Sequence, residues 1–131
     1  MTNQTTYFIG EFAEQTGLTI DTLRYYEKEG LLEPHRDANG RRQFSEVDRS
    51  WCEFIKRIKA TGMPLRAIKQ YSALRHQGNK TIDDRVALLK TQRQLLAAQR
   101  AEIDSHLAFL DKKMSTYAEM KQNLDCRNKN A

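Results

Sequence analysis

The chain of 131 residues has the size of a single domain, so a second globular domain is not expected. Its 39% hydrophobic and 30% charged residues favour a mainly helical, solvent-exposed architecture and leave no stretch suited to crossing a membrane. The formal net charge of +5 indicates anionic partners, and the first residues lack the basic start and apolar core of a secretory signal. We therefore expect a cytoplasmic protein without membrane contacts.

The positive charge is concentrated in the middle of the chain. Residues 1–44 carry five basic and seven acidic residues, residues 45–80 carry eight and three, and residues 81–131 carry nine and seven. The middle segment is therefore expected to supply a general attraction to an anionic partner, and the alternative is an ordinary solvated helix face. Its basic residues include Arg49, Lys56, Arg57, Lys59, Arg66 and Lys69.

The first predicted elements are two short helices. The pattern predicts one helix from about Gly10 to Thr16, ended by Gly17 in a left-handed turn. Thr19 is expected to cap a second helix through its hydroxyl, and Gly30 ends that helix. Two short helices joined by a tight glycine turn are typical of a helix-turn-helix motif.

The second helix carries side chains suited to reading a DNA groove and contacting phosphates. Arg24 can pair with two acceptors at once, and the Tyr25 hydroxyl can donate to a phosphate, although core packing is the alternative for this tyrosine. Leu23 and Tyr26 are expected to pack inward, because neighbouring helical side chains point to different faces. The candidate DNA contacts on this helix are Thr19, Thr22, Arg24 and Tyr25.

The segment from Leu31 to Phe44 is predicted to form a β-hairpin. It contains Pro34 and the turn sequence Asp37 to Gly40, with basic residues on both sides. A hairpin beside a helix-turn-helix is a wing, and its arginines are candidates for phosphate or minor-groove contacts, against the alternative of a solvated turn. These arginines are Arg36, Arg41 and Arg42.

Two further helices are expected to form a second wing. Residues 45–48 resemble a capping box that starts a helix ending before Gly62, and Met63-Pro64 begins the next helix, which residues 77–80 interrupt. Lys56 and Lys59 on the first of these helices are weaker candidates for DNA contacts. Its apolar residues Trp51, Phe54 and Ile58 are expected to lie in the core.

A long helix is predicted from Thr81 onward, because neither glycine nor proline follows it. Steps of four and three from Ile82 meet apolar residues at ten of thirteen positions, interrupted by Arg93, Arg100 and Lys121. Such a stripe is stable only when it is buried, so we expect a homodimer through a coiled coil. The alternative is that the long helix folds back onto the preceding part of its own chain, the head. The dimerisation residues are Ile82, Val86, Leu89, Leu96, Ile103, Leu107, Leu110, Met114 and Tyr117.

These elements predict three regions. Residues 1–78 are expected to form a winged helix-turn-helix DNA-binding domain that includes the second wing. Residues 79–121 are expected to form the dimerisation helix, and residues 122–131 a short polar tail. The tail is too short for a large ligand-binding domain, so the effector site is expected to be small or absent.

The chain shows no pattern of an enzyme, metal site or cofactor site. No nucleophile, base and orienting group fall into a recognisable arrangement, and neither cysteine lies at metal-ligand spacing from another ligand. Cys52 has basic neighbours in Arg49 and Lys56, which would lower its pKa and favour a reactive thiolate. Cys52 is therefore a candidate thiol sensor, and the alternative is an inert buried side chain.

The order of these motifs resembles the MerR family of bacterial transcription regulators over about residues 7–120. The residues that carry the resemblance are Leu23-Arg24-Tyr25-Tyr26-Glu27, Gly30-Leu31-Leu32, Arg42-Gln43-Phe44 and Gly62-Met63. It implies a winged-helix head, a two-helix second wing and an antiparallel coiled-coil dimerisation helix. It also implies a dimer that binds a palindrome in double-stranded promoter DNA with an overlong spacer. By bending and untwisting this spacer, the dimer lets RNA polymerase engage both promoter elements.

Within the family, the chain is most similar to the short-tailed branch that responds to aldehydes and electrophiles. It shares that branch's Trp-x-x-Phe-Ile-Lys helix and its Gly-Asn-Lys-Thr-Ile entry to the dimer helix. The branch's usual cysteine lies six residues after the tryptophan, where this chain has Arg57, whereas Cys52 follows Trp51 directly. The effector therefore stays unknown. The alternative functions are an architectural, excisionase-like DNA-bending protein without an effector and a coiled-coil adaptor that does not bind DNA.

Overall fold

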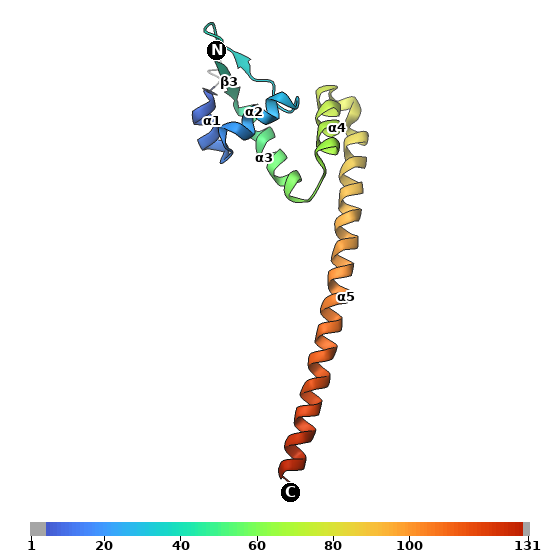
Figure 1. The fold of residues 1–131 in the computed structure, drawn as a ribbon. Coiled ribbons are helices and arrows are strands. Elements are labelled where there is room, and N and C mark those ends of the chain that lie inside the picture. Colours follow the sequence, from blue (N-terminus) through green and yellow to red (C-terminus); the bar gives the residue numbers. More distant parts are fainter. Residues whose placement is uncertain (1–4, 130–131) are drawn as a thin grey trace. The chain divides into compact units, whose positions relative to one another are not determined.

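The computed structural model describes residues 5–129, and Figure 1 shows its elements in chain order. The described residues up to Gln92 form one compact unit, and those from Arg93 onward form a second. Most described residues are helical, which confirms the expected fold class. The elements are β1 (Thr6–Tyr7), α1 (Ile9–Thr16), α2 (Ile20–Lys28), β2 (His35–Arg36), β3 (Arg42–Ser45), α3 (Glu46–Ala60), α4 (Leu65–His76), the 3-10 turn η1 (Asn79–Thr81) and α5 (Ile82–Lys129).

Helices α1 and α2 form the expected helix-turn-helix. Gly17 ends α1 with a φ of 71°, a left-handed conformation that glycine adopts without steric cost. Thr19 then caps α2 as predicted, because its Oγ1 accepts a hydrogen bond of 3.1 Å from the backbone N–H of Thr22. The first helix begins at Ile9, one residue before the predicted start.

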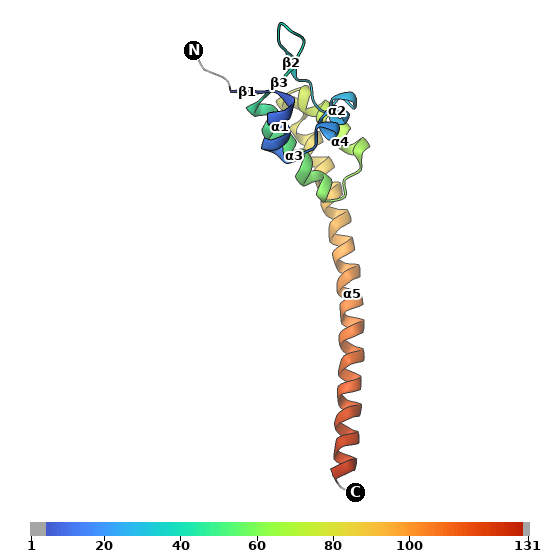
Figure 2. The same ribbon diagram turned by 60° about the vertical axis from the view of Figure 1, so that its left-hand side comes forward.

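The expected hairpin is present as the antiparallel pair β2 and β3, in which His35 faces Gln43 and Arg36 faces Arg42. Asp37 closes the turn, because its Oδ1 accepts 2.9 Å hydrogen bonds from two backbone N–H groups of the turn. Figure 2 shows this hairpin extending beyond the helices of its unit. The sheet order is β1-β3-β2, so strand β1, which was not predicted, pairs with the other edge of β3.

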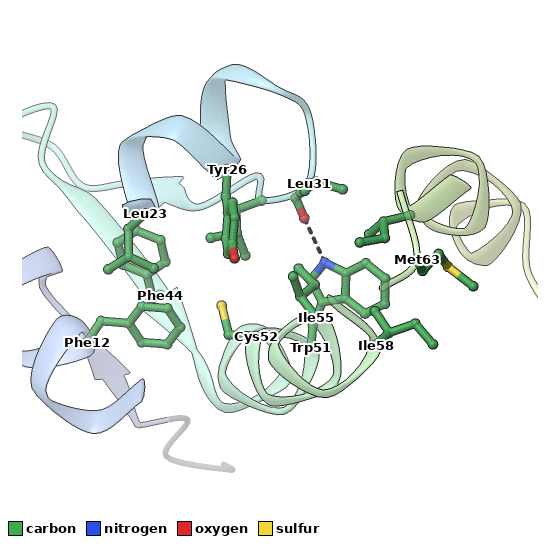
Figure 3. Close-up of a cluster of buried hydrophobic side chains, with 12 residues drawn as sticks. Phe12, Leu23, Tyr26, Leu31, Phe44, Trp51, Cys52, Ile55, Ile58 and Met63 are labelled. Carbon is green, nitrogen blue, oxygen red and sulfur yellow. Dashed lines mark hydrogen bonds between the residues drawn. The ribbon is translucent and has the colours of Figure 1, made fainter. Parts of the chain in front are cut away.

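The core of the first unit is built around aromatic side chains. Phe12 of α1 and Phe44 of β3 are fully buried, and their rings stack with centroids 4.4 Å apart. Figure 3 shows Leu23 beside this pair, which confirms its expected inward packing. The Trp51 indole donates a 2.7 Å hydrogen bond from Nε1 to the backbone oxygen of Leu31, so α3 is fixed to the segment that follows α2.

The second wing consists of α3 and α4. The predicted capping box at the start of α3 is present, with Ser45 and Asp48 each accepting a hydrogen bond from the other's backbone N–H. Lys69 of α4 donates a 2.6 Å hydrogen bond to the carboxylate of Glu29, which follows α2. The Lys69 ammonium group holds the pKa of Glu29 below its usual value. The second wing is thus tied to the helix-turn-helix.

Helix α5 begins inside the first unit. Leu89 packs against the core, and the Gln92 side chain donates a 2.7 Å hydrogen bond to the backbone oxygen of Thr61. The helix continues to Lys129, so the described part of the expected polar tail is helical, while residues 130–131 lie outside the described residues. We predicted that the DNA-binding domain ends at residue 78 and that the dimerisation helix follows it. This boundary stays a prediction, because it depends on which residues form the dimer.

Replacing Phe12 with alanine should lower the free energy of unfolding by about 3–5 kcal/mol, because it removes a fully buried ring and its stacking partner's contact. Urea denaturation followed by circular dichroism measures this change. The control is Val47→Ala, since Val47 is 65% exposed and its truncation should change stability by less than about 0.5 kcal/mol. A loss of less than about 1 kcal/mol for Phe12→Ala would contradict the central role of this pair.

Candidate nucleic-acid interface

The exposed face of α2 carries the side chains that sequence reasoning selected for base reading. Arg24 is exposed, and among residues 5–129 no acidic group lies within salt-bridge distance of it. Tyr25 is 45% exposed, whereas its neighbour Tyr26 is buried, so Tyr25 is not a core residue. The side chains of Arg24 and Tyr25 are therefore accessible to a ligand that approaches this face of α2.

Thr19 and Thr22 lie together at the start of α2. Besides the cap that Thr19 provides, the two hydroxyl oxygens are 2.8 Å apart and share a hydrogen bond. Thr19 is exposed and Thr22 is half-buried, so the hydroxyl pair lies at the surface of the N-terminal turn of α2. The positive end of the helix dipole at this turn favours an approaching phosphate.

The wing is fixed to α2 by a single carboxylate. Glu27 accepts a hydrogen bond of 3.2 Å from Arg36 through Oε1 and one of 2.5 Å from Arg42 through Oε2. Arg36 also donates a 2.9 Å hydrogen bond to the backbone oxygen of Gly40 in the hairpin turn. Both strands of the hairpin are therefore held against the helix that carries Arg24.

Arg41 lies at the tip of the wing with two neighbours of its own. Its guanidinium lies 4.5 Å from the centre of the Phe8 ring, and its Nε donates a 3.2 Å hydrogen bond to Asp37. Hydrogen bonding, first from the backbone of Arg41, lowers the pKa of Asp37. The Asp37 carboxylate therefore stays charged and holds the turn at neutral pH.

The structure brings the three predicted wing arginines to one hollow. This hollow of about 390 Å³ lies between the hairpin and the start of α1, where Phe8 and Ile9 form its apolar side. Its other lining residues are Arg36, Gly40, Arg41 and Arg42. Guanidinium groups around a shallow, open site suit the binding of phosphate oxygens.

The two lysines selected on α3 differ in their surroundings. Lys56 donates a 2.6 Å hydrogen bond to the backbone oxygen of Thr16 and lies 3.7 Å from the carboxylate of Glu53. Lys56 therefore satisfies a carbonyl at the end of α1, which is a structural role that the sequence did not reveal. Lys59 is exposed, and no acidic group among the described residues lies within salt-bridge distance of it.

Sequence reasoning missed Glu27 and Phe8 as part of this interface. Glu27 stands within the Arg-Tyr-Tyr-Glu motif, but nothing in the sequence indicates that it reaches residues nine and fifteen positions away. Phe8 follows Tyr7 directly before α1, and nothing in the sequence indicates that its ring lies against Arg41 of the wing. An acidic residue one helical turn after Arg24 was the only available signal for Glu27.

Cys52 is completely buried beside the aromatic core, as Figure 3 shows. Burial raises the pKa of its thiol to about 12, and the carboxylates of Asp48 and Glu53 add to this effect, while Lys56 opposes it. The expected lowering of this pKa by basic neighbours is therefore wrong, since desolvation outweighs the one nearby ammonium group. The structure gives no support to Cys52 as a reactive thiol.

No metal site or membrane-spanning helix is found in the part of the chain that the structure describes. There, no three histidine, cysteine, aspartate or glutamate side chains gather closely enough to hold a metal ion. None of the helices between residues 5 and 129 combines the length and the apolar character needed to cross a membrane.

Alkylation should distinguish the two cysteines. Burial keeps the Cys52 thiol protonated and inaccessible at pH 8, so iodoacetamide should modify the exposed Cys126 and leave Cys52 intact until urea unfolds the chain. Mass spectrometry of the digested protein measures the modification at each site. In Cys126→Ser, the folded chain should stay unmodified, and rapid modification of Cys52 in that variant would contradict its burial.

Comparisons with known proteins agree with this geometry. A model described as MerR HTH family regulatory protein matches residues 7–74, and one described as MerR, DNA binding, matches residues 50–105. An uncharacterised HTH-type transcriptional regulator of Haemophilus influenzae is 36% identical over 118 residues, covering 88% of this chain and 87% of that protein. The HTH-type transcriptional regulator AdhR of Bacillus subtilis is 40% identical over 89 residues, covering 67% and 64%.

Solved structures are similar over most of the chain. The crystal structure of HiNmlR, a MerR family regulator lacking the sensor domain and bound to promoter DNA, has a TM-score of 0.67 and 36% identity, covering 86% of each chain. A MerR family regulator from Listeria monocytogenes has a TM-score of 0.74 and 30% identity, covering 95% of this chain and 99% of that one. Because a family model spans more than half of the chain and these relatives align over most of it, the chain belongs to the MerR family of DNA-binding transcription regulators.

Proposed function

We propose that this regulator acts as a homodimer that binds a palindromic promoter site and distorts an overlong spacer, so that RNA polymerase engages both promoter elements. A small effector of unknown identity shifts the dimer between two DNA-bound states. The observation that carries the proposal is the exposed apolar stripe along α5. The first unit of the same chain exposes Arg24 and Tyr25 on α2, where they are accessible to DNA. The comparisons support DNA binding, and the dimer and the distortion are our inference.

The α5 stripe supports the dimer. Every described side chain from Arg93 to Asn128 is exposed in the single chain, although the stripe includes Ile103 (57% exposed), Leu107 (52%) and Met114 (62%). Apolar side chains at seam spacing over many turns are stabilised when a second helix covers them. We infer that the partner is a second copy of this chain, because the same seam on both copies gives a self-complementary interface.

The head supplies the DNA contacts. Phosphate oxygens are bound by the wing arginines and by the Tyr25 hydroxyl, and base edges are read by the Arg24 guanidinium on the exposed face of α2. Promoter DNA is named as the partner of the similar structure HiNmlR, which supports the same class of partner here. The proposed contacts are Thr19, Thr22, Arg24, Tyr25, Arg36, Arg41, Arg42, Lys56 and Lys59.

Distortion of DNA follows from fixed spacing. Two heads joined by a stiff coiled coil require half-sites at one separation, so DNA with a different spacing must bend or untwist to bind both heads. An effector that binds one conformation of the dimer more tightly changes the DNA geometry and thereby the promoter's activity. Repression and activation are then two states of one bound dimer.

The experiment that tests this function selects preferred duplexes from a random pool with the purified protein, then varies half-site spacing and salt. A palindrome with one sharply preferred spacing, and affinity that falls steeply with salt, would support the dimeric regulator. Weak binding that is indifferent to sequence and spacing would overturn it and favour the architectural DNA-bending protein.

Arg24→Ala should change which half-site bases are selected in this pool, because removing the exposed guanidinium removes a base-reading donor worth about 1–3 kcal/mol of discrimination. The matched control is Arg66→Ala on the exposed part of α4, which should leave the selected sequence unchanged. An unaltered preferred sequence for Arg24→Ala would show that Arg24 acts only through its charge.

Leu107→Glu should separate the dimer, because it places a carboxylate in the centre of the apolar seam, where burial without a partner is costly. Sedimentation equilibrium should show self-association weakened by at least about 100-fold, and affinity for the palindrome should fall with it. Lys112→Glu, a change on the opposite side of α5 from the seam, is the control and should leave the dimer intact. An unchanged dimer for Leu107→Glu would overturn the proposed seam.

A further inference from the structure

A second hollow lies inside the first unit, between α2, the C-terminal half of α3 and α4. Its floor consists of buried apolar side chains, among them Tyr26, Leu31 and Ile55, which Figure 3 shows as members of the hydrophobic cluster. Its rim carries Tyr25 and Lys59. The hollow therefore joins an apolar interior to two polar groups at its mouth, an arrangement typical of sites for small organic ligands.

The size of the hollow limits the ligand. Its volume is about 210 Å³, below the roughly 300–1,000 Å³ typical of sites for drug-sized molecules. An apolar cavity of roughly 150 Å³ is known to take up benzene, so one substituted benzene ring matches this space. The flat ring would lie against the apolar floor and against the face of Tyr26.

The positive charge of Lys59 at the rim favours a ligand with an anionic substituent on its ring. Lys59 lines the hollow, and among residues 5–129 no carboxylate lies within salt-bridge distance of its ammonium group. A ligand that fills the apolar space and carries one anionic group can place that group beside Lys59 and the Tyr25 hydroxyl. A single-ring aromatic carboxylate meets both requirements.

We propose that this hollow binds single-ring aromatic carboxylates, and that the bound ligand weakens DNA binding. The second part rests on the proposed function, in which Tyr25 and Lys59 contact DNA. A carboxylate that occupies the same two groups places a negative charge where a phosphate would lie, so ligand and DNA disfavour one another. The site lies between α2 and the second wing, and the contact between Glu29 and Lys69 joins the segment after α2 to α4.

The test titrates the dimeric full-length protein with benzoate and follows the methyl NMR signals of Ile55 and Ile68, two residues that line the hollow. Both signals should shift together along one saturable curve with a dissociation constant of about 10 mM or lower, since about 10 mM is the weakest affinity expected for a ligand of about nine non-hydrogen atoms. Benzamide, which has the same shape without the charge, should bind about threefold to fivefold more weakly than benzoate. Acetate, which lacks the ring, should cause no saturable shift.

Two variants distinguish the contribution of the aromatic ring to binding from that of the carboxylate charge. In Lys59→Met, benzoate and benzamide should bind equally well, whereas in the control Lys90→Met the preference for benzoate should remain. Leu65→Phe narrows the hollow from its rim and should abolish binding of both ligands. Thermal unfolding checks that each variant folds, and no saturable shift in the folded wild-type protein would overturn the site.

DNA affinity is then measured with and without benzoate at constant ionic strength. Benzoate near saturation should weaken binding of the selected palindrome in the wild type and should have no effect in Leu65→Phe, whose affinity without benzoate should match the wild type. Benzoate binding without any change in DNA affinity would overturn the coupling. Benzoate binding by a protein that recognises no DNA site would leave the hollow as a ligand site and overturn the proposed function instead.

Discussion

The arrangement of the head depends on the stacked pair Phe12 and Phe44. Phe44 lies on β3, the central strand of the sheet, so the same residue that is buried against α1 also fixes the strand to which β1 and β2 are hydrogen-bonded. Because both rings are fully buried, β3 cannot shift without exposing a large apolar surface to water. The wing is therefore positioned by the core, although all of its functional side chains lie outside it.

Glu27 adds a polar constraint to this apolar one. Its carboxylate pairs with Arg36 and Arg42, which lie directly opposite each other on β2 and β3, so one acidic side chain fixes both strands to α2. Because these contacts already hold the two guanidinium groups in the unliganded chain, the proposed binding of a phosphate there would cost less side-chain entropy. Glu27 thus lowers the local positive charge, and it holds the guanidinium groups of Arg36 and Arg42 in fixed positions.

Helix α5 combines two environments in one element. Its first turns are packed in the head through Leu89 and Gln92, whereas its later apolar residues are exposed within the chain. This division along a helix of 48 residues is consistent with the proposed dimer, in which a second copy of the chain covers the exposed apolar residues. The proposed site for aromatic carboxylates lies in the first unit, so a ligand there would bind next to α2.

The sequence by itself determined the element order, the caps and the inward or outward direction of most side chains, because these follow from periodicity and from local hydrogen bonding. The Thr19 cap, the capping box at Ser45 and the uninterrupted helix after Thr81 were all predictable in this way. Strand β1, the Glu27 pairs, the role of Lys56 and the raised pKa of Cys52 were not. Each of these depends on groups far apart in the chain, and only the tertiary structure decides which distant groups meet and how deeply they are buried.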